Sequence, residues 1–149
     1  MSKNGSKGFC AIGFENIKKE CNCGTLWRSA GILGASFIFT IGRRYTEQRS
    51  DTAKTWRNIP LYHYEDLDHF CKSLPRSCRL VGIEMDKKAI PIKKYSHLSR
   101  VAYMLGAEDF GLTRKAIEKC DHLISLPGET SLNVSTAGSI VLFDRLQKQ

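Results

Sequence analysis

The stretch LPGETSLNVS, residues 126–135, joins the last predicted strand to the last predicted helix. The run before it, His122–Leu126, is apolar and rich in β-forming residues, which is typical of a buried strand. The run after it, Val134–Leu146, places small and apolar residues at helical spacing and predicts a helix. A strand, a loop and a helix in this order are one unit of an α/β protein.

The same alternation extends back to the start of the chain. Further strand-like runs are Phe9–Phe14, Ser36–Ile41, Leu80–Met85 and Val101–Leu105. Helix-like segments are Asn22–Gly34, Asp66–Leu74 and a segment that Thr113 can cap and that runs through Cys120. The alternation predicts an α/β fold, with a mostly parallel sheet and helices on both faces. Ligands bind beyond the carboxyl ends of such strands, so the informative loops follow Met85, Leu105 and Leu126.

The length of 149 residues predicts a single domain over residues 1–149, because neither an internal repeat nor a linker is visible. Residues 1–7 are expected to form a flexible N-terminal tail. The longest apolar runs are too short to cross a bilayer, and no secretory signal is visible. We therefore expect a cytoplasmic protein.

The last helix is apolar nearly all round. A helix of this kind needs more than one surface to pack on, which predicts a contact with a second chain as well as with its own sheet. The apolar positions are Val134, Ala137, Gly138, Ile140, Val141, Leu142 and Phe143.

The six cysteines are expected to be reduced thiols, several of them in the core, since no export signal accompanies them. The spacing of Cys21 and Cys23 does not suit a zinc site, and the four histidines fit no metal motif, so no metal is predicted. Glycine-rich dinucleotide and P-loop motifs and a G-x-S-x-G elbow are absent from the sequence.

The chain carries 23 Lys and Arg against 15 Asp and Glu, a formal net charge of +8. A basic surface attracts phosphate backbones regardless of sequence, and the clusters at 43–44, 87–88 and 93–94 could carry this field. A surface that only keeps the protein in solution explains the charge nearly as well.

Three segments carry candidate chemistry: NCGTLWRSA (22–30), LGAEDFGL (105–112) and LPGETSLNVS (126–135). In this order they resemble the three motifs of the SpoU family, the ribose 2′-O-methyltransferase branch of the SPOUT class. The family patterns are N-x-G-x-x-x-R, G-x-E-x-x-G and a proline-led S-L-N-V-S. The resemblance spans about residues 9–146, nearly the whole chain.

The resemblance implies a C-terminal trefoil knot, an exception to the rule that chains avoid knots. It implies S-adenosylmethionine as the cofactor, a homodimer that forms the active site jointly, and RNA as the partner. Only RNA offers a ribose 2′-hydroxyl, and tRNA is favoured over rRNA because no RNA-binding domain is appended.

The resemblance also assigns roles to residues, each beside a plainer interpretation. Arg28 would pair with the substrate phosphate and assist removal of the 2′-hydroxyl proton. Because guanidinium stays protonated, we expect it chiefly to clamp the phosphate and stabilise the developing alkoxide, and whether it also takes the proton stays open; otherwise it is a surface arginine. Glu108 would orient Asn22, or is an ordinary loop glutamate. The implied catalytic residues are Arg28, Asn22, Glu108, Ser131 and Asn133.

The implied cofactor-binding residues are Ile83, Gly106, Leu126, Ser131 and Leu132. Gly106 and Gly111 would let the backbone approach the ligand closely, or they mark an ordinary turn. Ser131 and Asn133 could also cap the last helix. Pro127 and Ser131 lie closer together than in typical members, which bears on Leu126 in the pocket wall.

Two other functions stay open. A non-catalytic RNA-binding module could keep the same scaffold, and it would bind RNA without affinity for the cofactor. An ordinary small-molecule-binding α/β domain would show no strongly salt-dependent binding of RNA.

Overall fold

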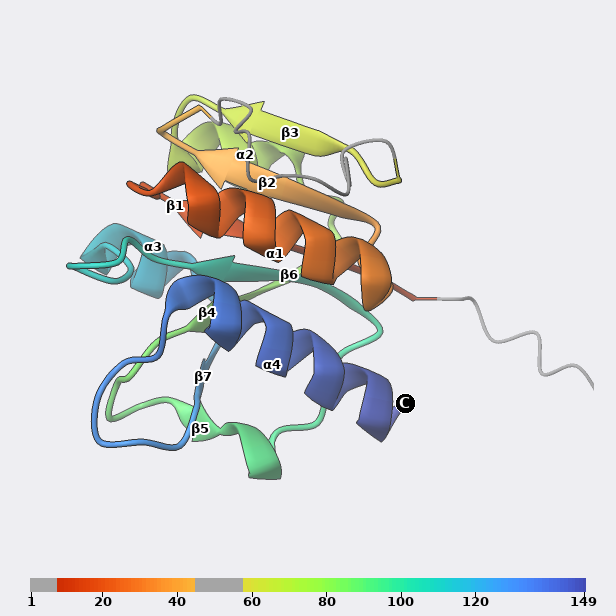
Figure 1. Ribbon diagram of the computed structural model, residues 1–149, viewed down its shortest axis with the longest axis vertical. Helices are drawn as coiled ribbons and strands as arrows, with labels where there is room; N and C mark the ends of the chain where they lie inside the picture. Colours follow the sequence, from red (N-terminus) through yellow and green to blue (C-terminus); the bar gives the residue numbers. More distant parts are fainter. Residues whose placement is uncertain (1–7, 45–57) are drawn as a thin grey trace, which may run out of the picture.

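The computed structural model describes residues 8–44 and 58–149, so the predicted tail at 1–7 lies outside the described residues. Within these residues seven strands form one sheet in the order β3-β2-β1-β6-β4-β7-β5 (Figure 1). Every neighbouring pair of strands is parallel, which confirms the α/β prediction. No described helix is long and apolar enough to span a membrane.

The strands and helices have the following bounds. The strands are β1 (Phe9–Glu15), β2 (Phe37–Ile41), β3 (Leu61–Tyr64), β4 (Arg79–Ile83), β5 (Ile90–Pro91), β6 (Arg100–Leu105) and β7 (His122–Ser125). The helices are α1 (Glu20–Ile32), α2 (Leu67–Ser73), α3 (Arg114–Lys119) and α4 (Val134–Lys148), with a 3₁₀ turn η2 at Ile92–Lys94.

Every predicted strand and helix is confirmed to within two residues at each end, and two strands were not predicted. The predicted strand Leu80–Met85 ends two residues early, at Ile83, which is the last residue of β4 in register with both β6 and β7. The sequence interpretation missed β3 and β5. β3 is only partly buried and β5 has two residues at the sheet edge, so neither produces a long apolar run.

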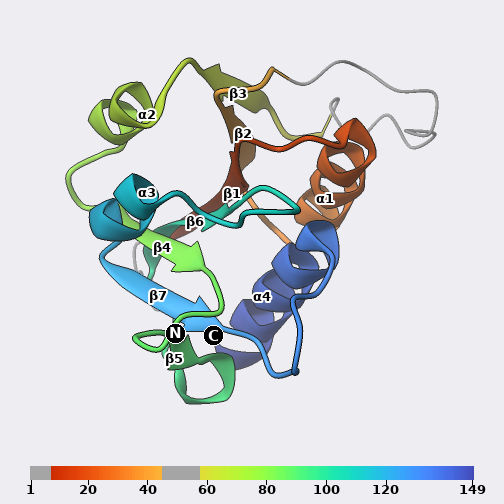
Figure 2. The same cartoon turned by 90° about the vertical axis from the view of Figure 1, so that its left-hand side faces the viewer.

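Helices cover both faces of the sheet, as predicted. Helices α1 and α4 pack side by side on one face, and α2 and α3 lie on the other (Figure 2). Side chains of a strand alternate between the faces, so Ile12 and Phe14 of β1 join the core under α1 and α4. Ala11 joins the core under α2 and α3. Cys10 and Cys23 are buried in the first core and Cys78 in the second, which confirms that several cysteines are core residues.

Short polar side chains cap the N-termini of α2, α3 and α4. Asp66 accepts a hydrogen bond from the N–H of His69 at 2.8 Å and starts α2. Thr113 accepts one from the N–H of Ala116 at 3.1 Å, which confirms its predicted cap of α3. The N-cap residue of α1, Lys19, has no side-chain cap.

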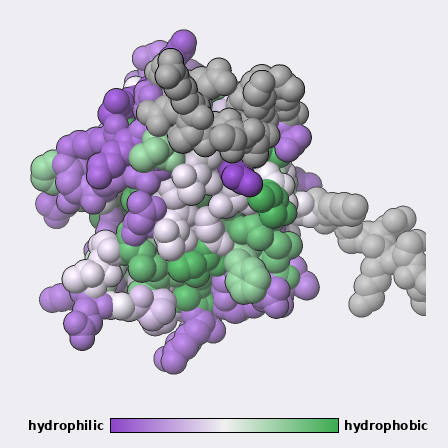
Figure 3. All heavy atoms as spheres, viewed as in Figure 1, coloured by the Kyte–Doolittle hydropathy of each residue, from purple (hydrophilic) through white to green (hydrophobic). Residues whose placement is uncertain are grey.

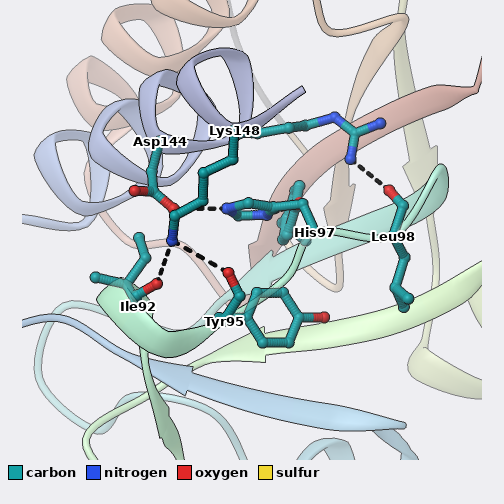
Figure 4. A network of polar contacts seen from close by, with 8 residues as sticks. Ile92, Tyr95, His97, Leu98, Asp144 and Lys148 are labelled. Atoms are coloured by element: carbon teal, nitrogen blue, oxygen red, sulfur yellow. Dashed lines mark hydrogen bonds and ion pairs between the residues drawn. The ribbon is translucent and has the colours of Figure 1, made fainter.

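A buried polar network ties the end of α4 to the loop before β6 (Figure 4). The side chain of His97 bonds Tyr103 at 2.6 Å through Nδ1 and Asp144 at 2.7 Å through Nε2. Burial lowers the pKa of His97 despite the Asp144 carboxylate, so the neutral ring donates to Asp144 and accepts from Tyr103. Lys148 pairs with Asp144 at 2.8 Å and donates to the carbonyl of Ile92. The network holds the C-terminal end of α4 against the segment before β6.

The outward side of α1 and α4 is strongly apolar. Hydrophobic surface gathers over these two helices in Figure 3. Its exposed members include Ile32, Ile140, Phe143 and Leu146, of which Phe143 is 55% exposed. The inner side of α4 packs on the sheet and on α1, so these side chains are what the chain's own core leaves uncovered.

Candidate active site

The candidate site lies at the carboxyl edge of the sheet. Because all strands are parallel, the loops after β4, β6 and β7 meet at this one edge. They surround a cavity of about 200 Å³. All the predicted cofactor-binding residues line it: Ile83, Gly106, Leu126, Ser131 and Leu132. Leu126 keeps its place in the wall despite the short connection between Pro127 and Ser131.

The loop after β6 is held as a tight hairpin by its own backbone. Ala107 and Gly111 exchange two hydrogen bonds of 3.1 and 2.9 Å, and Gly111 adopts a φ of 68°. A Cβ at Gly106 would lie 1.9 Å from the carbonyl carbon of Gly111 and 2.2 Å from the nitrogen of Leu112. The chain's own backbone therefore already requires glycine at 106, as the ordinary-turn interpretation expects, and Gly106 also lines the cavity.

The carboxylate of Glu108 binds the backbone just before α1 and a side chain of its first turn. It accepts hydrogen bonds from the N–H groups of Lys18 at 3.0 Å and Lys19 at 2.9 Å, and from Asn22 Nδ2 at 3.0 Å. Burial alone would raise the pKa of Glu108, but the bonds from the Lys19 N–H and the Asn22 amide outweigh it, and the pKa lies below its usual value. Glu108 is thus an ionised, fixed carboxylate rather than a free loop glutamate.

The hydrogen-bond chain continues from α1 to α4. Asn133 Nδ2 donates to Asn22 Oδ1 at 3.0 Å, and Ser135 Oγ donates to the Asn22 carbonyl at 2.6 Å. Asn133 Oδ1 also accepts from the N–H groups of Ser135 and Thr136, so it caps α4 as predicted. The chain Glu108–Asn22–Asn133 therefore contains one residue from each of the three motifs.

Two predicted site residues, Ser131 and Arg28, take no part in the Glu108–Asn22–Asn133 hydrogen-bond chain. Ser131 does not cap α4: its hydroxyl points to Met85, with Oγ 3.6 Å from the sulfur, so the capping interpretation is wrong for this residue. Arg28 lies exposed on α1 and does not line the cavity. Within the described residues Arg28 forms no hydrogen bond or ion pair, so its guanidinium is free to bind something outside the protomer.

Several cavity residues were missed by the sequence interpretation. Glu84 accepts from the N–H of Leu112 at 2.8 Å and so braces the hairpin from the end of β4. Phe110 is 83% exposed at the cavity rim, with Lys18 Nζ 5.1 Å from its ring centroid. The position of Glu84 directly after a strand was the only available signal, while Phe110 lies inside a motif that leaves its position unspecified.

The charged residues that line the cavity are all acidic: Glu84, Glu108 and Asp109. The remaining wall is largely apolar, with Ile83, Leu105, Leu126 and Leu132 among its residues. Asp109 is already paired with Lys18, whereas Glu84 and Glu108 have no cationic partner among the described residues. Two such carboxylates beside an apolar wall suit a ligand that carries positive charge on an otherwise apolar body. No group of three or more His, Cys, Asp or Glu in the described part of the chain could hold a metal ion.

We expect a Glu108→Gln variant to lose about 1 kcal/mol of unfolding free energy at pH 7, since an amide nitrogen would face donors that now meet a carboxylate oxygen. The pKa of Glu108 is lowered by folding, so its contribution is present above the unfolded pKa, about 4.3, and is lost as pH falls through the lower folded value. Urea unfolding at pH 7 and pH 3 measures this. Glu65→Gln, at an exposed position, is the control, and an equal loss in both variants would contradict the assignment.

Comparison with known proteins gives the family. Residues 10–143 match the SpoU rRNA Methylase family. A 23S rRNA (guanosine-2′-O-)-methyltransferase, RlmB, of Acinetobacter baylyi is 36% identical over 74 residues, which cover 48% of this chain and 30% of the relative. An uncharacterized tRNA/rRNA methyltransferase of Archaeoglobus fulgidus is 26% identical over 136 residues, covering 87% of this chain and 60% of the relative. The chain thus spans 30 to 60% of the length of these two relatives.

Solved structures show the same fold. The AdoMet-bound rRNA methyltransferase of Sinorhizobium meliloti has a TM-score of 0.80 at 22% identity, covering 95% of this chain and 57% of that one. The SpoU methyltransferase AviRb of Streptomyces viridochromogenes, in complex with AdoMet, has a TM-score of 0.82 at 19% identity, covering 96% and 58%. A structure described for the 2-OH methylation of C/U34 on tRNA has a TM-score of 0.82 at 17% identity, covering 96% and 97%.

The fold and site define an α/β protein with a ligand cavity at the carboxyl edge of a parallel sheet. The chain belongs to the SpoU rRNA Methylase family, since the match covers most of its length. The trefoil knot at the C-terminal end stays a prediction drawn from the family.

Proposed function

We propose that the protein is an S-adenosylmethionine-dependent RNA methyltransferase that acts on a ribose 2′-hydroxyl, in tRNA or rRNA, in the cytoplasm. One observation carries the proposal: Glu108, Asn22 and Asn133 form a hydrogen-bond chain beside the cavity. These hydrogen bonds bring one residue from each motif, 86 and 111 positions apart in sequence, to one place beside the cavity, which supports a shared site. Family membership and the activities named for the relatives support the reaction.

The residues present fit the cofactor. S-adenosylmethionine carries a sulfonium cation, and the cavity has carboxylates and no basic side chain among its lining residues. Ile83, Leu126 and Leu132 would hold the adenine, with Gly106 offering backbone contacts and Ser131 polar ones. When bound, the cofactor would supply a methyl group on an electrophilic carbon.

The chain's own residues would align and stabilise the acceptor. Arg28 would clamp the RNA phosphate next to the target ribose and stabilise the charge that develops on the 2′-oxygen. Glu108 would fix Asn22, and Asn22 would fix Asn133 at the start of α4. Transfer at carbon would need mainly this alignment, because the oxygen–methyl bond forms as the sulfur–methyl bond breaks, and the 2′-hydroxyl proton would pass to solvent water.

A homodimer would bring Arg28 to a cavity. Arg28 lies outside the cavity of its own protomer, and it shares α1 with Ile32 of the exposed apolar surface. Burying that surface, which also includes Ile140, Phe143 and Leu146 of α4, against a second copy would satisfy the expectation for the last helix. The site would then combine Arg28 of one protomer with the cavity of its partner.

Calorimetry with S-adenosylmethionine separates the enzyme from the non-catalytic RNA-binding module. We expect saturable binding of the cofactor and, with RNA added, methyl transfer that is blocked when the acceptor riboses lack the 2′-hydroxyl. Mapping of methylated riboses in RNA from cells with and without the gene identifies the position. RNA binding with no cofactor affinity would instead establish the binding module, and salt-independent RNA affinity would contradict both.

A further inference from the structure

A second cavity adjoins the candidate active site and has the opposite charge. It measures about 590 Å³ and lies between the loop after β4, the edge strand β5 with η2, and the loop after β7. Figure 1 shows these segments side by side. The two cavities share Met85, Leu126 and Pro127, so one wall separates them.

Lysines and apolar side chains form this second cavity. Pro91, Ile92 and Leu126 supply apolar lining, and Lys87 and Lys93 supply charge. Lys88 and Lys94 are exposed beside them, so two of the three basic clusters seen in the sequence lie on one short segment. Within the described residues none of these four lysines forms an ion pair. The one acidic lining residue, Asp86, already accepts from the N–H of Lys88 at 2.8 Å.

Because their lining residues differ in charge, the two cavities favour different ligands. Acidic lining at the first cavity favours a cationic donor, whereas unpaired lysines at the second disfavour it and attract phosphate. A volume of this size with an apolar wall accommodates a nucleobase, and the lysines can reach the phosphate attached to it.

We propose that the second cavity binds a nucleotide of the RNA substrate adjacent to the methylated one, with its base against Pro91, Ile92 and Leu126 and its phosphate at Lys87 and Lys93. The assignment rests on the proposed function, because it requires RNA as the substrate. It gives the RNA a path from the lysine segment 87–94 over the wall at Met85 to the first cavity.

The double variant Lys87→Gln/Lys93→Gln tests the phosphate contact, with unfractionated tRNA and an rRNA fraction as probes. We expect RNA affinity to fall about tenfold and the slope of log K against log salt to decrease by about 1.5, as the loss of two phosphate contacts requires. Cofactor affinity by calorimetry should not change. Lys72→Gln/Lys119→Gln removes two exposed lysines from α2 and α3 and serves as the charge-matched control.

A second variant tests the base contact. Pro91→Trp fills the second cavity without touching the lining of the first, and we expect about tenfold weaker RNA binding with an unchanged salt slope. Wild-type RNA affinity in both variants, equal weakening in the control, or loss of cofactor affinity in the lysine variant would each overturn this inference alone. A wild-type protein that binds no RNA would contradict the proposed function as well.

Discussion

An Arg28→Ala variant should fold normally, bind S-adenosylmethionine normally and transfer methyl groups at least about a hundredfold more slowly than the wild type. Arg28 is exposed and forms no polar contact within the described residues, so its loss should change the unfolding free energy by less than about 0.5 kcal/mol. The loss in rate follows because the phosphate would lose its bidentate partner and the developing alkoxide its nearest cation. Single-turnover methyl transfer and cofactor calorimetry measure the two effects separately.

The matched control is Arg114→Ala, which removes an exposed arginine from α3 on the opposite face of the sheet. It should retain wild-type turnover. Near-normal turnover of Arg28→Ala would remove Arg28 from the mechanism.

Mixing two inactive variants tests whether Arg28 acts across a dimer. After subunit exchange between Arg28→Ala and Ser131→Ala proteins, about half of the dimers are mixed and each has one intact site of two, so about a quarter of the activity should return. Activity that stays absent would place Arg28 and Ser131 in the same protomer and contradict the shared site.

A Gly106→Ala variant should lose cofactor binding and about 1–3 kcal/mol of unfolding free energy. The new Cβ would lie 1.9 Å from the carbonyl carbon of Gly111, and backbone cannot rotate away as a side chain can. The hairpin must therefore open, and Glu108, which it carries, would lose its geometry toward Asn22. Urea unfolding and calorimetry with S-adenosylmethionine measure the two losses.

The control for this substitution is Gly34→Ala at the end of α1. Its φ of 87° makes alanine strained, but the added Cβ meets no atom within 4 Å and the position is remote from the cavity. It should cost about 1–2 kcal/mol of stability and leave cofactor affinity intact. Wild-type cofactor affinity in Gly106→Ala would show that the hairpin does not shape the pocket.

Local patterns explain why much of the fold could be predicted. Strands buried on both faces read as continuous apolar runs, so β1, β2, β6 and β7 were visible in the sequence. Caps such as Asp66 and Thr113 act within four residues and are equally local. β3 and β5 escaped because their pairing comes from neighbouring strands and not from their own composition.

The residues of the candidate site, like the strands, could be predicted only in part from the sequence. The motifs identified residues around the cavity, but Glu84 and the rim residue Phe110 were missed because nothing in their immediate neighbourhood marks them. The sequence also could not distinguish whether Gly106 makes room for a ligand or for the chain itself, since both need a missing Cβ.

By itself, the sequence determined the alternation of strands and helices, the net positive charge and the three motifs that place the chain in its family. These depend on residue type and on spacing along the chain. Only the tertiary structure decided that Asn22 is hydrogen-bonded to both Glu108 and Asn133, that Arg28 does not line the cavity of its own protomer, and that two cavities of opposite charge share a wall. Those facts depend on distances between segments up to 111 residues apart, which are set by how parallel strands bring their carboxyl ends to one edge.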